Sequence, residues 1–229
     1  MKTIGLIGGM SWESTAHYYA ILNRETATRL GGLHSAPVIV HSVDFAPIEA
    51  LQRADRWDEA GDMLARVAAS LEAQGCGVLG LATNTMHICF ERIVRDLSVP
   101  MIHIAVPTAA ALEADGIGTV GLLGTRFTME NRFYIEALEA SGFEVLVPDV
   151  GITNLNGIIY DELCRGIVRD ESRRVYVEAI ERLGARGAEA VILGCTEIGM
   201  LIDDAVSPVP TYDTTDLHAK ALVAAALSE

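Results

Sequence analysis

Two short sequence segments each occur twice in this 229-residue sequence. In both copies of one segment, an apolar run is followed by a residue that could take part in proton transfer. Residues 77–85 read GVLGLATNT and residues 189–197 read EAVILGCTE, so an apolar run leads to Thr83 in one copy and to Cys195 in the other. A thiolate is a competent base, and a hydroxyl can donate a hydrogen bond or pass on a proton. Because the two positions are equivalent, we expect Thr83 and Cys195 to act on the two faces of one small molecule.

The second repeated phrase indicates what must position these residues. TIGLIGG at residues 3–9 returns as TVGLLGT at residues 119–125. We therefore expect an α/β protein with two pseudo-symmetric Rossmann-like lobes, each a parallel sheet flanked by helices, and an active site in the cleft between them. The last predicted helix follows Pro208 and Pro210 and is expected to return to the first lobe. The predicted domains are residues 1–98 plus 211–229 and residues 99–210.

Apolar runs predict the strands, and apolar residues spaced three and four apart predict the helices. The predicted strands are 3–8, 37–43, 77–82, 100–104, 119–123, 143–147 and 189–194. The predicted helices are 14–30, 57–74, 86–97, 128–141, 155–168, 171–186 and 215–227. Parallel sheets bind ligands beyond the carboxyl ends of their strands, where Met10, Thr83, Thr125 and Cys195 fall.

The charge of the chain limits its partners. A formal net charge of −14 and a pI near 4.8 oppose binding to nucleic acids or anionic membranes, which needs clustered Lys and Arg. No apolar run reaches the roughly 18 residues of a membrane helix, and the N-terminus shows no charged-then-apolar leader. We expect a soluble, cytoplasmic protein with a small-molecule substrate.

No cofactor or metal is expected. The only lysines, Lys2 and Lys220, precede the first strand and lie in the last helix, which are poor positions for a pyridoxal Schiff base. The four cysteines lack C-x-x-C spacing, and the first glycine-rich turn lacks the G-x-G-x-x-G and Walker patterns of nucleotide sites. Such a turn either closes a strand-to-helix corner or brings backbone N–H groups to a small carboxylate.

Five motifs, in order along nearly the whole chain, carry a resemblance. They are GGMSWEST (8–15), ATNTMH (82–87), LGTRFT (123–128), IYDEL (159–163) and GCTE (194–197). Together they resemble the cofactor-independent aspartate/glutamate racemase family, most closely its broad-specificity amino-acid racemase or L-aspartate/glutamate-specific branch. The resemblance implies a homodimeric, pyridoxal-independent isomerase. Most of the family has two catalytic cysteines, whereas this chain has Thr83 at the first position.

The resemblance also implies roles for individual residues. Cys195 would take the α-proton of the L-enantiomer, and Thr83 would serve the face of the D-enantiomer. Met10 and Gln52 match positions that touch substrate in relatives. Neutral donors for the substrate carboxylate would come from Asn84, Thr85 and Thr196, with the backbone N–H groups after Thr83 and Cys195, although helix capping also explains Thr85 or Thr196. Thr125 opens the equivalent turn of the second lobe and is a further substrate-binding candidate. His87 could order the Thr83 loop and Glu197 could orient or deprotonate the thiol, both from a second layer.

Recognition of the substrate side chain is less determined. Aspartate-specific relatives use an arginine near the Gln52 position and a lysine after a motif like IYDEL, but this chain has Arg53 next to Gln52 and Cys164 at the second place. Arg53 and Arg126 are candidates that could equally be surface residues, and Cys164 could form a small neutral wall. The other histidines, including His103 and His218, show no partner at metal or triad spacing.

Two other classes of function fit the same scaffold. Arylmalonate decarboxylases keep only the second-half cysteine, which the loss of the first cysteine here would match, and maleate isomerases and hydantoin racemases share the lobes. A non-catalytic amino-acid binding protein is the third class. Replacement of Cys195 by alanine would leave binding intact in that third case.

Overall fold

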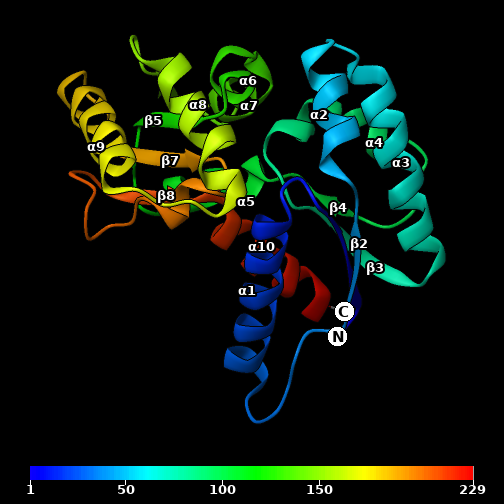
Figure 1. The fold of residues 1–229 in the computed structure, drawn as a ribbon. Coiled ribbons are helices and arrows are strands. Elements are labelled where there is room, and N and C mark those ends of the chain that lie inside the picture. The colour runs from blue at the N-terminus through cyan, green and yellow to red at the C-terminus, as the bar shows by residue number, and fades with distance from the viewer. Residues whose placement is uncertain (229) are drawn as a thin grey trace. The chain divides into compact units, whose positions relative to one another are not determined.

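Residues 1–228 are described in a computed structural model of the chain, which divides into two compact units. Unit 1 comprises residues 1–104 and 218–229, and unit 2 comprises residues 105–217. Both are parallel four-stranded sheets flanked by helices, so the predicted fold class is confirmed (Figure 1). None of the helices within residues 1–228 combines the length and apolar character that a membrane crossing requires.

The sheet of unit 1 has the strand order β2-β1-β3-β4. Its strands are β1 (Thr3–Gly8), β2 (Val38–Ser42), β3 (Cys76–Leu81) and β4 (Met101–Ile102), and its helices are α1 (Trp12–Leu30), α2 (Phe45–Arg53), α3 (Trp57–Ala73) and α4 (Phe90–Val94). A 3₁₀ helix, Thr85–Cys89, follows β3. Helix α10 (Thr214–Leu227) begins in unit 2 and packs its later residues into unit 1.

Alternation along β1 and β3 puts apolar side chains on both faces of this sheet. One face packs Leu6 and Val78 against Tyr18 of α1 and Leu222 of α10. The other face packs residues of α2, α3 and the 3₁₀ helix. Helix α10 comes close to the strand at Gly80, where an added Cβ would lie 2.5 Å from Cδ1 of Leu222 and that side chain would have to move.

Unit 2 repeats this plan with the strand order β6-β5-β7-β8. Its strands are β5 (Thr119–Gly124), β6 (Glu144–Leu146), β7 (Ala190–Gly194) and β8 (Thr211–Asp213), and its helices are α5 (Ala105–Ala114), α6 (Arg126–Glu130), α7 (Arg132–Glu139), α8 (Ile152–Asp161) and α9 (Asp170–Ala185). Two 3₁₀ helices, Leu163–Arg165 and Ile198–Met200, complete it. One core joins Leu123, Val191 and Leu193 to α8 and α9.

Several predicted helices were wrong in extent. The predicted helix 86–97 is the 3₁₀ helix followed by the short α4, and the predicted helix 155–168 is α8, which begins earlier, followed by a 3₁₀ turn that ends at Gly166 in the left-handed region. The predicted helix 128–141 is broken at Asn131, whose backbone is extended. Helices α2 and α5 were not predicted, since each is short and carries a proline in its first turn, and the three-residue β8 was also missed.

Candidate active site

The strand registers put Thr83 and Cys195 at equivalent positions of the two units. Leu81 of β3 pairs with Ile7 of β1, and Leu193 of β7 pairs with Leu123 of β5. In each unit the backbone then leaves the carboxyl edge of the sheet two residues later, at Thr83 in unit 1 and at Cys195 in unit 2. Both side chains are buried, each with 7% exposed surface. The duplication seen in the sequence therefore extends to the pairing of the strands.

Thr83 lies in a backbone held at both of its polar groups. Its N–H donates to the carbonyl of Leu81 at 2.9 Å, and its own carbonyl lies 2.8 Å from Nδ1 of His87. Within residues 1–228 the Thr83 hydroxyl makes no hydrogen bond to another residue. Asn84 and Thr85 follow at the start of the 3₁₀ helix and are buried. Two hydrogen bonds thus hold the Thr83 backbone, while its hydroxyl is left available to a ligand.

Met10 and Gln52 lie on the same side of the unit 1 sheet as the 3₁₀ helix. Met10 is buried with Met86 in the cluster under α2 and α3. The Gln52 Nε2 donates to Sδ of Met86 at 3.0 Å, while its Oε1 is buried without a hydrogen-bond partner in residues 1–228. A buried amide oxygen left unsatisfied is costly, so it marks a position where a ligand donor would be stabilised. We call Met10, Gln52, Thr83, Asn84 and Thr85 the first half-site.

Cys195 lies beside an acid that the sequence places two residues later. The Cys195 Sγ donates to Oε2 of Glu197 at 2.9 Å, and Thr196 Oγ1 donates to the same oxygen at 2.8 Å. Thr196 therefore uses its hydroxyl on Glu197. Burial, the charge of Glu197 and the neighbouring Cys164 raise the pKa of Cys195 well above its usual value. At neutral pH the resting side chain is a thiol whose proton points at a carboxylate.

Thr125 and Cys164 complete the second half-site, which comprises Thr125, Cys164, Cys195, Thr196 and Glu197. Thr125 caps α6 and its Oγ1 accepts from the N–H of Thr128 at 3.2 Å, so it has a structural role. Cys164 is half-buried and packs against the cluster that contains Cys195. Burial, with smaller contributions from Cys195, Cys164 and Glu197, raises the pKa of Tyr176 well above its usual value.

The two candidate arginines lie outside both half-sites. Arg53 is 76% exposed and pairs with Glu49 on its own helix, and Arg126 is 56% exposed and lies 3.8 Å from Glu130. Within residues 1–228 no lysine or arginine is buried. The surface alternative stated for these two arginines thus fits their position.

The unit 1 core contains a histidine cluster that was missed in the sequence. The ring of His87 lies 4.6 Å from that of His103 and 6.1 Å from that of His218, centroid to centroid. His218 is held by the Tyr18 hydroxyl at 2.8 Å and by the carbonyl of Ile102 at 2.9 Å. No local pattern could have found it, because the three histidines come from three separate segments.

This cluster predicts acid lability of unit 1. Burial lowers the pKa of His103 and of His218 from 6.5 to about 4, and burial with the two neighbouring rings lowers that of His87 well below 6.5. Below pH 6.5 the unfolded chain therefore binds more protons than the folded chain. The contribution of these neutral histidines to the free energy of unfolding is fully present above pH 6.5 and is lost as the pH falls toward 4. His103 and His218 alone should cost on the order of 5 kcal/mol over this window.

Urea unfolding at several pH values tests this, and both tryptophans, Trp12 and Trp57, lie in unit 1 and report on it by fluorescence. The expected free energy of unfolding drops steeply between pH 6.5 and 4.5, and this drop is smaller in a His218→Phe variant. A free energy that stays constant from pH 7 to pH 5 would show that the cluster is not neutral in the folded state.

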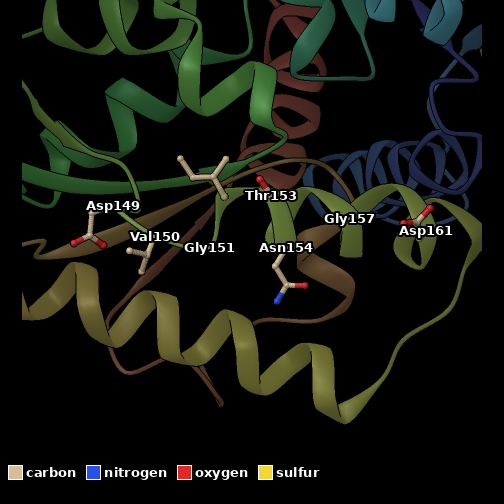
Figure 2. A pocket seen from close by; sticks show the side chains of 8 residues that line it. Asp149, Val150, Gly151, Thr153, Asn154, Gly157 and Asp161 are labelled. Carbon is tan, nitrogen blue, oxygen red and sulfur yellow. The ribbon is translucent and has the colours of Figure 1, made fainter.

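A hollow of about 780 Å³ lies at the start of α8 in unit 2 (Figure 2). Its lining includes Asp149, Asn154 and Asp161, and Figure 2 shows these side chains spread along the turn and helix. None of the predicted site residues lines it. It is therefore separate from the thiol of Cys195.

Comparison with known proteins identifies the family of this chain. The sequence profile of the Asp/Glu/Hydantoin racemase family matches residues 7–222. A candidate Asp/Glu racemase from Yersinia pestis of known crystal structure is 46% identical, with both chains covered completely and a TM-score of 0.91. An aspartate racemase homologue from Pyrococcus horikoshii is 33% identical over all of both chains, with a TM-score of 0.84. The broad specificity amino-acid racemase RacX of Bacillus subtilis is 25% identical over 98% of each chain.

Proposed function

This chain belongs to the Asp/Glu/Hydantoin racemase family, and from that premise we propose that it is a cofactor-independent amino-acid racemase. It would interconvert L- and D-forms of aspartate, glutamate or a broader set of amino acids. The observation that carries this proposal is that Cys195, at the position equivalent to Thr83, donates a hydrogen bond from its thiol to Glu197. Two-base racemisation requires one group on each face of Cα, so the mechanism requires both half-sites to flank one substrate.

We propose that Cys195 works as a relay. As its sulfur takes the α-proton of the L-enantiomer, the S–H bond present at rest breaks and that proton moves to Oε2 of Glu197. The carbanion is then protonated on the opposite face by the Thr83 hydroxyl, which takes a replacement proton from solvent water. Glu197 afterwards releases its proton to solvent, so the charges balance. The relay avoids forming a free thiolate from a thiol whose pKa is raised.

Neutral donors would stabilise the carbanion. Negative charge developing on the substrate carboxylate needs donors already in place. Asn84 and Thr85 in the first half-site and the N–H groups that follow Cys195 in the second are suited to this task. The Gln52 Oε1, buried without a partner in residues 1–228, would accept from the substrate ammonium group. No pyridoxal or metal is required for these steps.

The absence of buried lysine and arginine in residues 1–228 favours a broad set of substrates over strict selection of an acidic side chain. Arg53→Ala is accordingly expected to change kcat/KM for aspartate by no more than about twofold, as for an exposed substitution. Arg126→Ala serves as the matched variant. Steady-state kinetics with aspartate and with a neutral amino acid check this. A selective rise in KM for aspartate in one variant would instead identify that arginine as the side-chain ligand.

The proposal is tested by chiral chromatography of a panel of L-amino acids, beginning with glutamate and aspartate, incubated with enzyme that has been dialysed against chelator and hydroxylamine. D-product from at least one amino acid, lost in Cys195→Ala, supports racemisation. Binding of an amino acid without turnover supports a binding protein.

A one-sided reaction is the second candidate, and the threonine at position 83 is the observation in its favour. A decarboxylase needs only one proton donor after loss of carbon dioxide, and the Cys195 thiol could be that donor. Release of carbon dioxide from phenylmalonate, without racemisation of any amino acid, would favour it.

A further inference from the structure

The side chain of His87 bridges two segments of unit 1. Its Nδ1 lies 2.8 Å from the Thr83 carbonyl, and its Nε2 accepts the N–H of Ile104 at 3.2 Å. Because Nε2 accepts, it carries no proton, and because Nδ1 faces a carbonyl, it must carry one. The partners therefore assign a neutral imidazole with the proton on Nδ1. Residue 87 connects the turn after β3 to the end of β4.

The surroundings of His87 suit this neutral form. The ring is 2% exposed, stacks on Phe90 and faces the rings of His103 and His218. The ionisable groups facing the cluster are these histidines and the Tyr18 hydroxyl that holds His218. No carboxylate is among the groups that shift the pKa of His87. A second proton on this ring would be unpaired, and Nε2 could no longer accept from Ile104.

Unit 2 shows that the fold does not need this histidine. The position equivalent to His87 is Gly199, and the carbonyl of Cys195, equivalent to that of Thr83, accepts the backbone N–H of Ile198 at 3.0 Å. The strand register likewise makes Asp213 the equivalent of His103, and a Cβ on Gly199 would lie 2.5 Å from its Oδ2. The carbonyl at this position is therefore held by a backbone N–H beside Cys195 and by an imidazole beside Thr83.

We propose that His87 is a positioning residue for Thr83, holding the Thr83 carbonyl so that the hydroxyl is aimed at Cα of the substrate. This inference rests on the proposed racemase function. A hydroxyl is a poor proton donor and depends on its placement more than a thiol does, and a misplacement of about 1 Å can cost on the order of a hundredfold in rate. Cys195 has an acid within hydrogen-bond distance, whereas Thr83 has an imidazole that holds its backbone carbonyl.

Three substitutions separate the two hydrogen bonds of His87. His87→Asn keeps a donor near the place of Nδ1 and loses the acceptor for Ile104. His87→Gln reaches toward the place of Nε2 and loses the donor to Thr83. His87→Phe keeps the ring packing and loses both. The matched control is His218→Phe, which also removes two hydrogen bonds from the cluster but none to Thr83.

The readout is the ratio of two initial rates in D₂O, namely loss of the Cα–H signal of L-glutamate or L-aspartate and formation of the D-enantiomer. His87→Phe and His87→Gln should slow D-product formation by tenfold to about a hundredfold and raise the ratio of Cα–H loss to D-product. His87→Asn should restore most of the wild-type ratio, and His218→Phe should leave it unchanged. Equal slowing of both rates in His87→Phe, or no advantage of asparagine over glutamine, would overturn the inference.

A second measurement does not depend on catalysis. The ¹⁵N chemical shifts of His87 should report the neutral Nδ1–H tautomer from pH 8 down to pH 5 in the wild-type protein. Assignment of the Nε2–H tautomer or a charged ring at pH 6 would overturn the positioning role. Wild-type enzyme that neither exchanges nor racemises any amino acid, together with the expected tautomer, would instead refute the proposed racemase function.

Discussion

Cys195→Ala is expected to lower amino-acid racemisation by about 10³-fold or more, because it removes the group proposed to receive the α-proton. Binding should persist, since the neutral donors of both half-sites remain. Cys195→Ser should also be strongly impaired, because a hydroxyl accepts a carbon-bound proton poorly. The measurement is kcat and KM by chiral chromatography, with substrate affinity measured by calorimetry.

The matched control for this variant is Cys76→Ala. Cys76 is another buried cysteine, at the start of β3 and 2% exposed. The Cys76→Ala variant should lose some stability, because the substitution leaves a small cavity, while keeping the wild-type kcat. If Cys76→Ala and Cys195→Ala lose activity equally, the loss reflects folding, and the assignment of Cys195 as a catalytic base fails.

Glu197→Gln is expected to produce two opposite changes. The carboxylate raises the pKa of Cys195 through its charge and its hydrogen bond, so the amide should lower that pKa, although burial still holds it above the usual value. Alkylation of Cys195 by iodoacetamide near pH 8 should therefore be faster in the variant. Racemisation near pH 7 should nevertheless fall by about 10²-fold, because the relay has lost its proton acceptor.

The pH profile of this variant distinguishes a relay from simple orientation of the thiol. Without Glu197 the reaction depends on thiolate formed by loss of the proton to solvent. Its rate should then rise about tenfold per pH unit below the pKa of Cys195, while the wild-type rate changes little between pH 6.5 and 8.5. Mass spectrometry of the alkylated peptide separates Cys195 from the other three cysteines. A variant that keeps the wild-type rate and profile would exclude Glu197 from proton transfer.

The duplicated phrases are what made the fold predictable. Each carries a buried strand and the turn that follows it, and strand registers such as Ile7 with Leu81 and Leu123 with Leu193 depend on apolar alternation that is visible in the sequence. The elements that were missed are short or begin with a proline in the first turn, as in α2 and α5. Their helical state depends on packing against the sheet, which no local pattern reports.

The placement of the candidate site residues could also be predicted from the sequence. Thr83, Cys195 and Glu197 follow the repeated strands β3 and β7, so the duplication pointed to them. The hydrogen bond between the Cys195 thiol and Glu197 could not be predicted from the sequence, because a separation of two residues permits many side-chain orientations. The contacts of His87 were not predictable either, since its partner Ile104 and the rings of His103 and His218 come from other segments of the chain.

The central claim is that Thr83 and Cys195 transfer protons on opposite faces of Cα. The most direct test is mass spectrometry of both enantiomers after the first few per cent of conversion of L-glutamate, or of the best substrate found, in D₂O. The account predicts a D-product that carries deuterium at Cα while the remaining L-substrate keeps most of its protium. A D-product that retains protium at Cα would show that one group carries the same proton across, and would contradict the two-base account.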